Sequence, residues 1–187
     1  MILTVMIAGI GARAQGNVNK KCNCQFQSIN IIGLLEGETG TSFQIQTING
    51  IVYKQWYAGI GTGLDYYQFR GVPVFLDIRH NLLKKNSTPF IYSSIGIHYP
   101  WKRKEDTFNE DTQLYAGLFY DIGLGLNLAK TKNQGFYLSA GYSHKRVKQS
   151  FTNFENCLIL PCMESKITRT NGLNRLSIKA GWRFLGN

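Results

Sequence analysis

The chain has 187 residues, of which 43% are hydrophobic, 13% aromatic and 17% charged, and its formal net charge is +10. The aromatic content excludes intrinsic disorder, which needs few aromatic residues and a high charge fraction. After the N-terminus no apolar run approaches the roughly 20 residues that a spanning helix requires. The length suits one domain, and the composition indicates a β-protein, either soluble or in a membrane as a barrel.

The first segment, Met1–Ala14, predicts export. Its apolar run is too short to span a bilayer but suits the hydrophobic region of a signal peptide, and it ends in the small-x-small pattern that precedes cleavage. We expect the mature chain to begin near Gln15, with residues 15–27 as a periplasmic N-terminal segment and residues 28–187 as the barrel domain. A buried N-terminal strand or helix is the alternative.

The four cysteines agree with an oxidising compartment. Cys157 and Cys162 bracket Leu-Ile-Leu-Pro in a loop-like stretch, and we expect them to form a disulfide there. Cys22 and Cys24 are too close in sequence to bond each other easily, and the sequence assigns them no role. No pair of histidines lies at a ligand spacing near either cysteine pair, so no metal site is predicted.

Period-two alternation dominates the sequence after residue 27 and predicts about eight strands. Many of them approach the 9–11 residues that a tilted transmembrane strand needs. The expected strands are Ser28–Gly37, Ser42–Tyr53, Trp56–Tyr67, Val72–Leu82, Phe90–Trp101, Leu114–Leu128, Phe136–Lys145 and Leu173–Leu185.

The expected strands have one aliphatic face and one face that mixes charges, glycines and tyrosines. In a soluble sandwich the charged face would meet water, whereas in an outer-membrane barrel it fills the lumen and the aliphatic face meets lipid. Long strands, aromatic residues near strand ends and the glycine-rich polar face favour the barrel. We therefore predict an all-β fold, an eight-stranded antiparallel up-and-down transmembrane β-barrel with a side-chain-filled lumen. A soluble secreted barrel or sandwich is a weaker alternative.

Two sets of site residues follow from this assignment. The charges on the inner face are expected to pair as a structural network, because an uncompensated buried charge is costly. They are Asp65, Asp77, Arg79, Asp121, Arg175, Lys179 and Arg183. The residues expected to form the aromatic girdles are Trp56, Tyr66, Tyr99, Trp101, Trp182 and Phe184.

The lengths of the connections predict the orientation. Most connections are short, and the two long ones, 102–113 and 146–172, follow the fifth and seventh expected strands. Short periplasmic turns and longer outer loops are typical of outer-membrane barrels. We expect both termini in the periplasm and basic residues at the outer rim that could meet lipopolysaccharide phosphates. These residues are Lys102, Arg103, Lys104, Lys148, Lys166 and Arg169.

Several segments resemble small outer-membrane β-barrel proteins of Bacteroidota. They are Trp56–Tyr67 (WYAGIGTGLDYY), Val72–Arg79 (VPVFLDIR), Pro89-Phe90 and Leu176–Phe184 (LSIKAGWRF). The resemblance covers nearly the whole mature chain and implies a barrel in the cell outer membrane, but it says little about activity. One departure is that Leu185-Gly186-Asn187 follow the aromatic residue that is expected at the extreme C-terminus.

The motifs of enzymes are weak in this sequence. Ser143 and His144 are adjacent and point to opposite faces of a strand, while Ser94 and His98 lie roughly 13 Å apart along one face. His80 has no obvious serine partner. The alternating glycines of 59–63 lie within a strand and do not form a phosphate-binding loop.

We therefore predict a non-enzymatic outer-membrane protein with a structural role or a surface-interaction role through its long outer loops. The alternative is an outer-membrane enzyme that modifies lipid A or phospholipid. The expected partners are outer-membrane lipid and lipopolysaccharide, with no cofactor and no nucleic acid, since the basic residues form no continuous stripe. The surface partner is unknown, and a monomer is expected.

Overall fold

The computed structural model describes residues 24–85, 87–101, 112–130, 134–154 and 164–186. In this part of the chain nine strands form one antiparallel sheet. They are β1 (Cys24–Gly37), β2 (Gly40–Tyr53), β3 (Trp56–Asp65), β4 (Gly71–Asn81), β5 (Pro89–Pro100), β6 (Gln113–Tyr115), β7 (Gly117–Lys130), β8 (Gln134–Phe154) and β9 (Glu164–Leu185). None of the described segments forms a helix long and apolar enough to cross a membrane.

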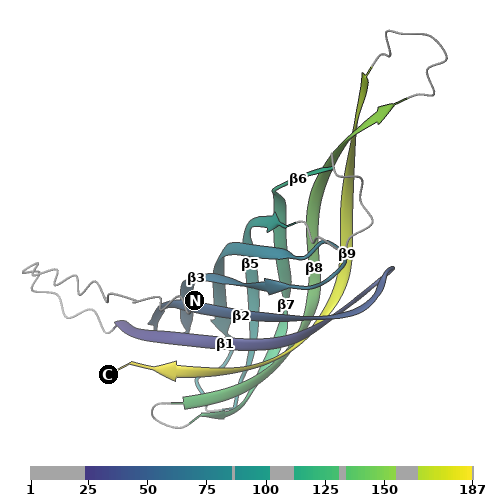
Figure 1. The fold of residues 1–187 in the computed structure, drawn as a ribbon. Coiled ribbons are helices and arrows are strands. Elements are labelled where there is room, and N and C mark those ends of the chain that lie inside the picture. The colour runs from purple at the N-terminus through teal and green to yellow at the C-terminus, as the bar shows by residue number, and fades with distance from the viewer. Residues whose placement is uncertain (1–23, 86, 102–111, 131–133, 155–163, 187) are drawn as a thin grey trace, which may run out of the picture.

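The eight long strands close into a barrel (Figure 1). Each pairs with the next along the chain, and β9 returns to β1 over a register that runs from Gln27↔Leu185 to Gly37↔Arg175. The short strand β6 pairs only with the outer part of β8, from Gln113↔Ser150 to Tyr115↔Lys148. The structure therefore confirms the predicted eight-stranded antiparallel up-and-down barrel.

The prediction of a loop over residues 146–172 is wrong for most of that range. Arg146–Phe154 continues β8 and Glu164–Gly172 begins β9, and the two paired stretches extend from Arg146↔Gly172 to Phe154↔Glu164. Figure 1 shows this hairpin rising beyond the other strands. The sequence did not reveal it because the extension lacks the aliphatic face by which the other strands were recognised.

Other strand boundaries differ by a few residues. β1 begins at Cys24, four residues before the expected strand, because Cys24–Gln27 pairs with the end of β2. The expected strand 114–128 is interrupted at Ala116, which separates β6 from β7. β3 ends at Asp65 instead of Tyr67. The proposed signal peptide lies outside the described residues and remains a prediction.

We name the two ends of the barrel by their connections. The turn end carries connections 54–55, 82–88 and 131–133, together with the outermost residues Cys24 and Leu185. The hairpin end carries connections 38–39, 66–70 and 101–112 and the protruding part of β8 and β9. Gly40, beside the first of these, has φ +99°, a left-handed conformation that glycine adopts without steric cost.

Large apolar side chains lie on both faces of the barrel wall. The outer face exposes aliphatic residues on every long strand, and Leu124, Ile178 and Ile60 are each more than 60% exposed. Inside, a cluster of buried side chains packs across the lumen. It consists of Ile29, Ile31, Ile48, Tyr57, Phe75, Phe90, Tyr92, Phe119 and Tyr137. An outer face of this kind is costly in water and suits lipid.

Glycines on the inner face make room for these rings. A Cβ atom added at Gly61 would lie 2.4 Å from Phe75 Cε2, and one added at Gly125 would lie 2.2 Å from Phe90 Cζ. Both distances are far below van der Waals contact. The glycine-rich face that the sequence displays is therefore the packing surface of the lumen aromatics.

Candidate functional site

The buried carboxylates of the lumen each contact a cation. In the middle of the barrel Asp77 accepts hydrogen bonds from Arg79 Nε at 2.7 Å and from the Ser94 hydroxyl at 2.7 Å. Asp121 accepts one from Lys179 Nζ at 2.6 Å and one from the Tyr92 hydroxyl at 2.8 Å. Charge-assisted bonds of this length offset the desolvation of both partners.

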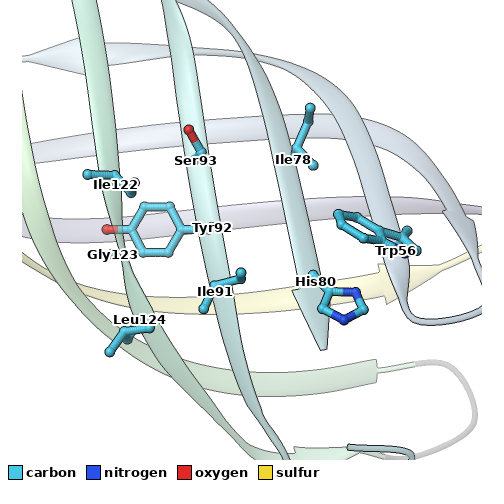
Figure 2. A pocket seen from close by; sticks show the side chains of 9 residues that line it. All are labelled: Trp56, Ile78, His80, Ile91, Tyr92, Ser93, Ile122, Gly123 and Leu124. Carbon is cyan, nitrogen blue, oxygen red and sulfur yellow. The ribbon is translucent and has the colours of Figure 1, made fainter. Parts of the chain in front are cut away.

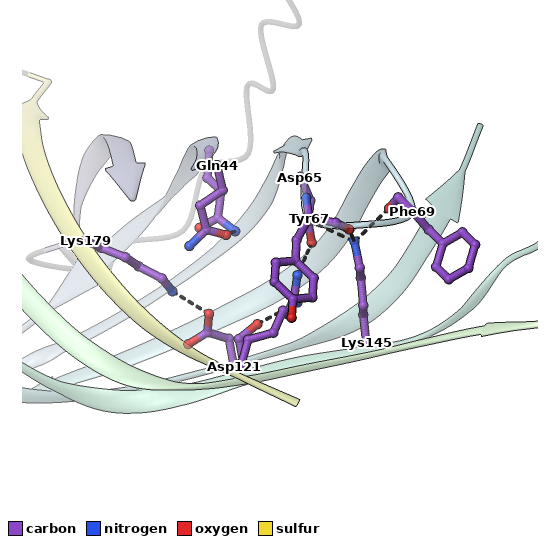
Figure 3. Close-up of polar contacts among 10 residues, drawn as sticks. Gln44, Asp65, Tyr67, Phe69, Asp121, Lys145 and Lys179 are labelled. Carbon is purple, nitrogen blue, oxygen red and sulfur yellow. Dashed lines mark hydrogen bonds and ion pairs between the residues drawn. The ribbon is translucent and has the colours of Figure 1, made fainter. Parts of the chain in front are cut away.

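At the hairpin end one carboxylate binds two cations. Asp65 lies 3.0 Å from Lys145 Nζ and 2.5 Å from Arg175 Nη1. Lys145 Nζ also donates to the backbone carbonyls of Tyr67 at 2.6 Å and Phe69 at 2.7 Å, as Figure 3 shows. The connection between β3 and β4 is therefore drawn into the barrel mouth, where the side chains of Tyr67 and Phe69 are buried.

Aromatic rings surround the guanidinium of Arg79. Its Cζ lies between 5.0 and 6.0 Å from the ring centroids of Tyr57, Phe90, Tyr92 and Tyr137. Arginine over aromatic faces is a favourable arrangement in a desolvated site. The rings and the guanidinium together fill the lumen between Asp77 and the turn end.

All seven inner-face charges that the sequence singled out are buried, and six of them take part in the ion pairs described above. Arg183 is the exception, because it has no carboxylate partner among the described residues. Sequence reasoning missed Lys145, which it placed at the end of an expected strand. The signal was present, since Lys145 continues the inward alternation of Ser139 and Ser143.

The lumen leaves little free volume. The inner cavity beside Tyr57, Arg79 and Arg183 has a volume of about 70 Å³. The described interior is thus filled by side chains, as eight-stranded barrels of this width generally are.

The three histidines lie apart from the serines considered as nucleophiles. Ser143 faces inward and accepts a hydrogen bond from Arg175 Nη2 at 2.8 Å, while His144 lies 2.6 Å from Asn174 Oδ1. His98 is fully buried, with no partner for either ring nitrogen among the described groups. The ring of His80 lies on Trp56. Within the described part of the chain no hydroxyl–histidine pair of a nucleophilic site is formed, and no group of three metal-ligating side chains occurs.

A shallow apolar groove runs over the outside of β3, β4, β5 and β7. It has a volume of about 470 Å³, and its walls include Trp56, Ile78, Ile91 and Leu124. Figure 2 shows these side chains spread over neighbouring strands and the paired rings of Trp56 and His80 at one end. His80 and Ser93 also line the groove, but no hydrogen bond joins them among the described residues. The mainly apolar lining suits contact with hydrocarbon.

The predicted girdle residues lie near the two ends of the barrel. Trp56, Trp182 and Phe184 are near the turn end, and Tyr66, Tyr99 and Trp101 are near the hairpin end. Tyr66 stacks on Phe43, with ring centroids 4.3 Å apart. The predicted disulfide Cys157–Cys162 and the basic residues 102–104 lie outside the described residues.

Comparison with known proteins supports the fold. No family model and no characterised protein sequence matches the chain. Three solved outer-membrane proteins share the architecture. OprG from Pseudomonas aeruginosa aligns with a TM-score of 0.57 at 9% identity, covering 88% of this chain and 96% of its own. AlkL, solved in lipid bilayers, aligns with a TM-score of 0.56 at 7% identity, covering 87% of this chain and 90% of its own. Neisserial surface protein A aligns with a TM-score of 0.52 at 12% identity, covering 86% of this chain and 96% of its own. At sequence identities this low, the similarity shows a shared fold and says nothing of a shared function.

Proposed function

We propose that this chain is a non-enzymatic protein of the cell outer membrane, of the small barrel type found in Bacteroidota. The observation that carries the proposal is the arrangement of the closed barrel, in which aliphatic side chains face outward on every long strand and ion pairs lie inside. Outer-membrane barrels have this arrangement, with aromatic girdles at both interfaces. The three structural neighbours are themselves outer-membrane proteins.

In this proposal the protein acts at the cell surface through the hairpin of β8 and β9. The hairpin extends beyond the barrel wall (Figure 1) and carries exposed basic residues, Lys148, Lys166 and Arg169. Cations at that level can meet the phosphates of lipopolysaccharide or an anionic surface partner. The connection 102–113 would share the same side of the membrane.

The location is tested by separating inner and outer membranes on a density gradient after expression in a Gram-negative host. We expect the protein in the outer-membrane fraction, migrating faster on a gel before heating than after it. Recovery in the soluble fraction, without a change of mobility on heating, would support the soluble alternative.

The non-enzymatic role is tested by mass spectrometry of lipid A and phospholipids. Cells with and without the protein should give the same lipid spectra, because the described hydroxyl groups and histidines assemble no nucleophile–base pair. A new lipid A or lysophospholipid species that depends on the protein would instead support the enzymatic alternative.

A further inference from the structure

The turn end of the barrel contains a polar pocket of about 340 Å³. It lies between the turn 54–55, the connection 82–88 and the last residues of β9. Four of its lining side chains are cationic, namely Lys54, Lys84, Lys85 and Arg183. The other described lining residues are neutral, so none of them brings a carboxylate to the pocket.

Arg183 is the distinctive member of this set. Its side chain is on the inner face of β9 and only 8% exposed, and its Nε has no hydrogen-bond partner among the described groups. Every other inner-face cation described above has a carboxylate within 3.0 Å. Because a buried guanidinium without an anion is unfavourable, this position favours an anionic ligand.

The charges of the surrounding strands cannot supply that anion. Asp77 on β4 is bound to Arg79, and Asp121 on β7 is bound to Lys179. Arg79 lines the same small inner cavity as Arg183, but as a cation already paired with Asp77 it offers Arg183 no anion.

The sequence of this end is basic throughout its connections. Residues 54–55, 82–88 and 131–133 contain lysines and no aspartate or glutamate. The connections of the hairpin end mix both signs, with Glu38, Arg70 and the acidic and basic residues of 102–111. The connections of the turn end, taken together, therefore carry positive charge alone, and clustered positive charge attracts anions.

The neutral walls of the pocket are held in place by hydrogen bonds. Asn127 Nδ2 donates to Asn81 Oδ1 at 2.9 Å, and the Asn127 backbone N–H donates to the Thr88 carbonyl at 3.0 Å. The Leu83 backbone N–H donates to the Thr88 hydroxyl at 2.9 Å. The segment that carries Lys84 and Lys85 is thereby tied to β7, and its lysines line the same pocket as Arg183.

We propose that this pocket binds a phosphate group through Arg183, with Lys54, Lys84 and Lys85 as further donors. A guanidinium presents a fork of N–H donors that fits phosphate oxygens, and three ammonium groups match the oxygens left over. A carboxylate has only two oxygens and leaves part of this donor set unpaired. The group can belong to free phosphate or to the headgroup of a phospholipid, and the experiment separates the two sources.

The test uses the whole protein in dodecyl maltoside, a detergent without phosphate, and calorimetric titration. The first probe is inorganic phosphate, with acetate as the comparison anion. The second is short-chain phosphatidic acid, with the diacylglycerol of the same chains as its phosphate-free match. We expect saturable binding of at least one phosphate probe and at least tenfold weaker binding of the matched compound.

Variants assign the binding to the pocket. Arg183→Gln should weaken the affinity for the phosphate probe at least tenfold. The double variant Lys84→Gln with Lys85→Gln should weaken the same affinity at least threefold. Arg70→Gln removes a partly exposed cation from the connection 66–70 at the hairpin end and should leave phosphate binding unchanged. Each variant is first checked for the change of mobility on heating. If Arg183→Gln does not fold, the double lysine variant, whose side chains are exposed, decides the test.

Binding of phosphatidic acid alone identifies the lipid headgroup as the source, and binding of inorganic phosphate alone identifies the free ion. The proposal is overturned if neither probe saturates, or if acetate binds as tightly as phosphate. Equal affinity of the wild type and the folded pocket variants would overturn it as well. The membrane location is tested separately by fractionation, so failure of either proposal can be told from failure of the other.

Discussion

Asp65 and Arg175 are 110 positions apart in the sequence, yet their side chains lie 2.5 Å apart inside the barrel. The pair joins the hairpin end of β3 to β9 across the lumen, and Lys145 on β8 contacts the same carboxylate. One aspartate thus links three strands and, through Lys145, the connection 66–70.

Replacing Asp65 by Asn should destabilise the barrel by about 3–5 kcal/mol, because it leaves two buried cations without their carboxylate. The measurement is the free energy of unfolding in urea of the protein folded into lipid vesicles. Glu38→Gln, which neutralises an exposed acid on the connection 38–39, should change it by less than about 0.5 kcal/mol. Equal effects of the two variants would show that Asp65 does not hold the network.

Replacing Gly125 by Ala should cost about 1–3 kcal/mol, since the new methyl group overlaps the ring of Phe90. That ring has little freedom to move, because it packs edge-on against Tyr137 with centroids 5.3 Å apart. The matched control is Gly172→Ala on β9, where the nearest atom to the added Cβ is His144 Cε1 at 3.3 Å. The free energy of unfolding in urea should be lower for Gly125→Ala than for Gly172→Ala. Identical stabilities of the two variants would contradict the packing of Phe90 against Gly125.

Leu124 tests whether the outer face lies in lipid. It is 65% exposed on β7, and Leu124→Arg should reduce the free energy of folding into vesicles by about 2–4 kcal/mol if the residue is near the bilayer midplane. Ile167→Arg makes a similar change on the protruding part of β9 and should cost less than about 0.5 kcal/mol. If Leu124→Arg were as mild as its control, this face would not be in hydrocarbon.

Planar-bilayer recordings test the filled lumen. The purified protein should give no stable conductance of porin size, because Tyr57, Phe75 and Phe119 pack across the interior and the inner cavity at the turn end holds only about 70 Å³. A reproducible conductance of that size would mean that the lumen opens, and would give the inner charges a role in ion selectivity.

The sequence predicted the closed barrel and the two faces of its wall because both depend on local alternation. Asp77 and Arg79, for example, share a face with period two, and that periodicity is preserved in β4. The choice of partner for each charge could not be predicted in the same way, since it depends on the register between distant strands. The contact between Asp65 and Lys145 requires both that register and the length of β8.

The features that sequence reasoning missed lack such periodicity. Phe69 is buried in a connection in which Gln68 has a positive φ of 49°. No repeating pattern of the sequence predicts that its side chain turns inward. The hairpin extension of β8 and β9 is polar on both sides near Lys148 and Arg169, so it resembled a loop. That Arg183 lacks a carboxylate partner among the described residues could be recognised only from the structure, which shows the partners of the other six charges.

The most direct test of the central claim is fluorescence quenching by brominated phospholipids of graded depth. The three tryptophans, Trp56, Trp101 and Trp182, lie near the two ends of the barrel and belong to the predicted girdles. In vesicles we predict strong quenching by bromine atoms close to the headgroups and weaker quenching by bromine atoms near the chain ends, because girdle residues lie at the interface. Absence of quenching at every depth, or strongest quenching at the bilayer centre, would contradict the proposed barrel in the membrane.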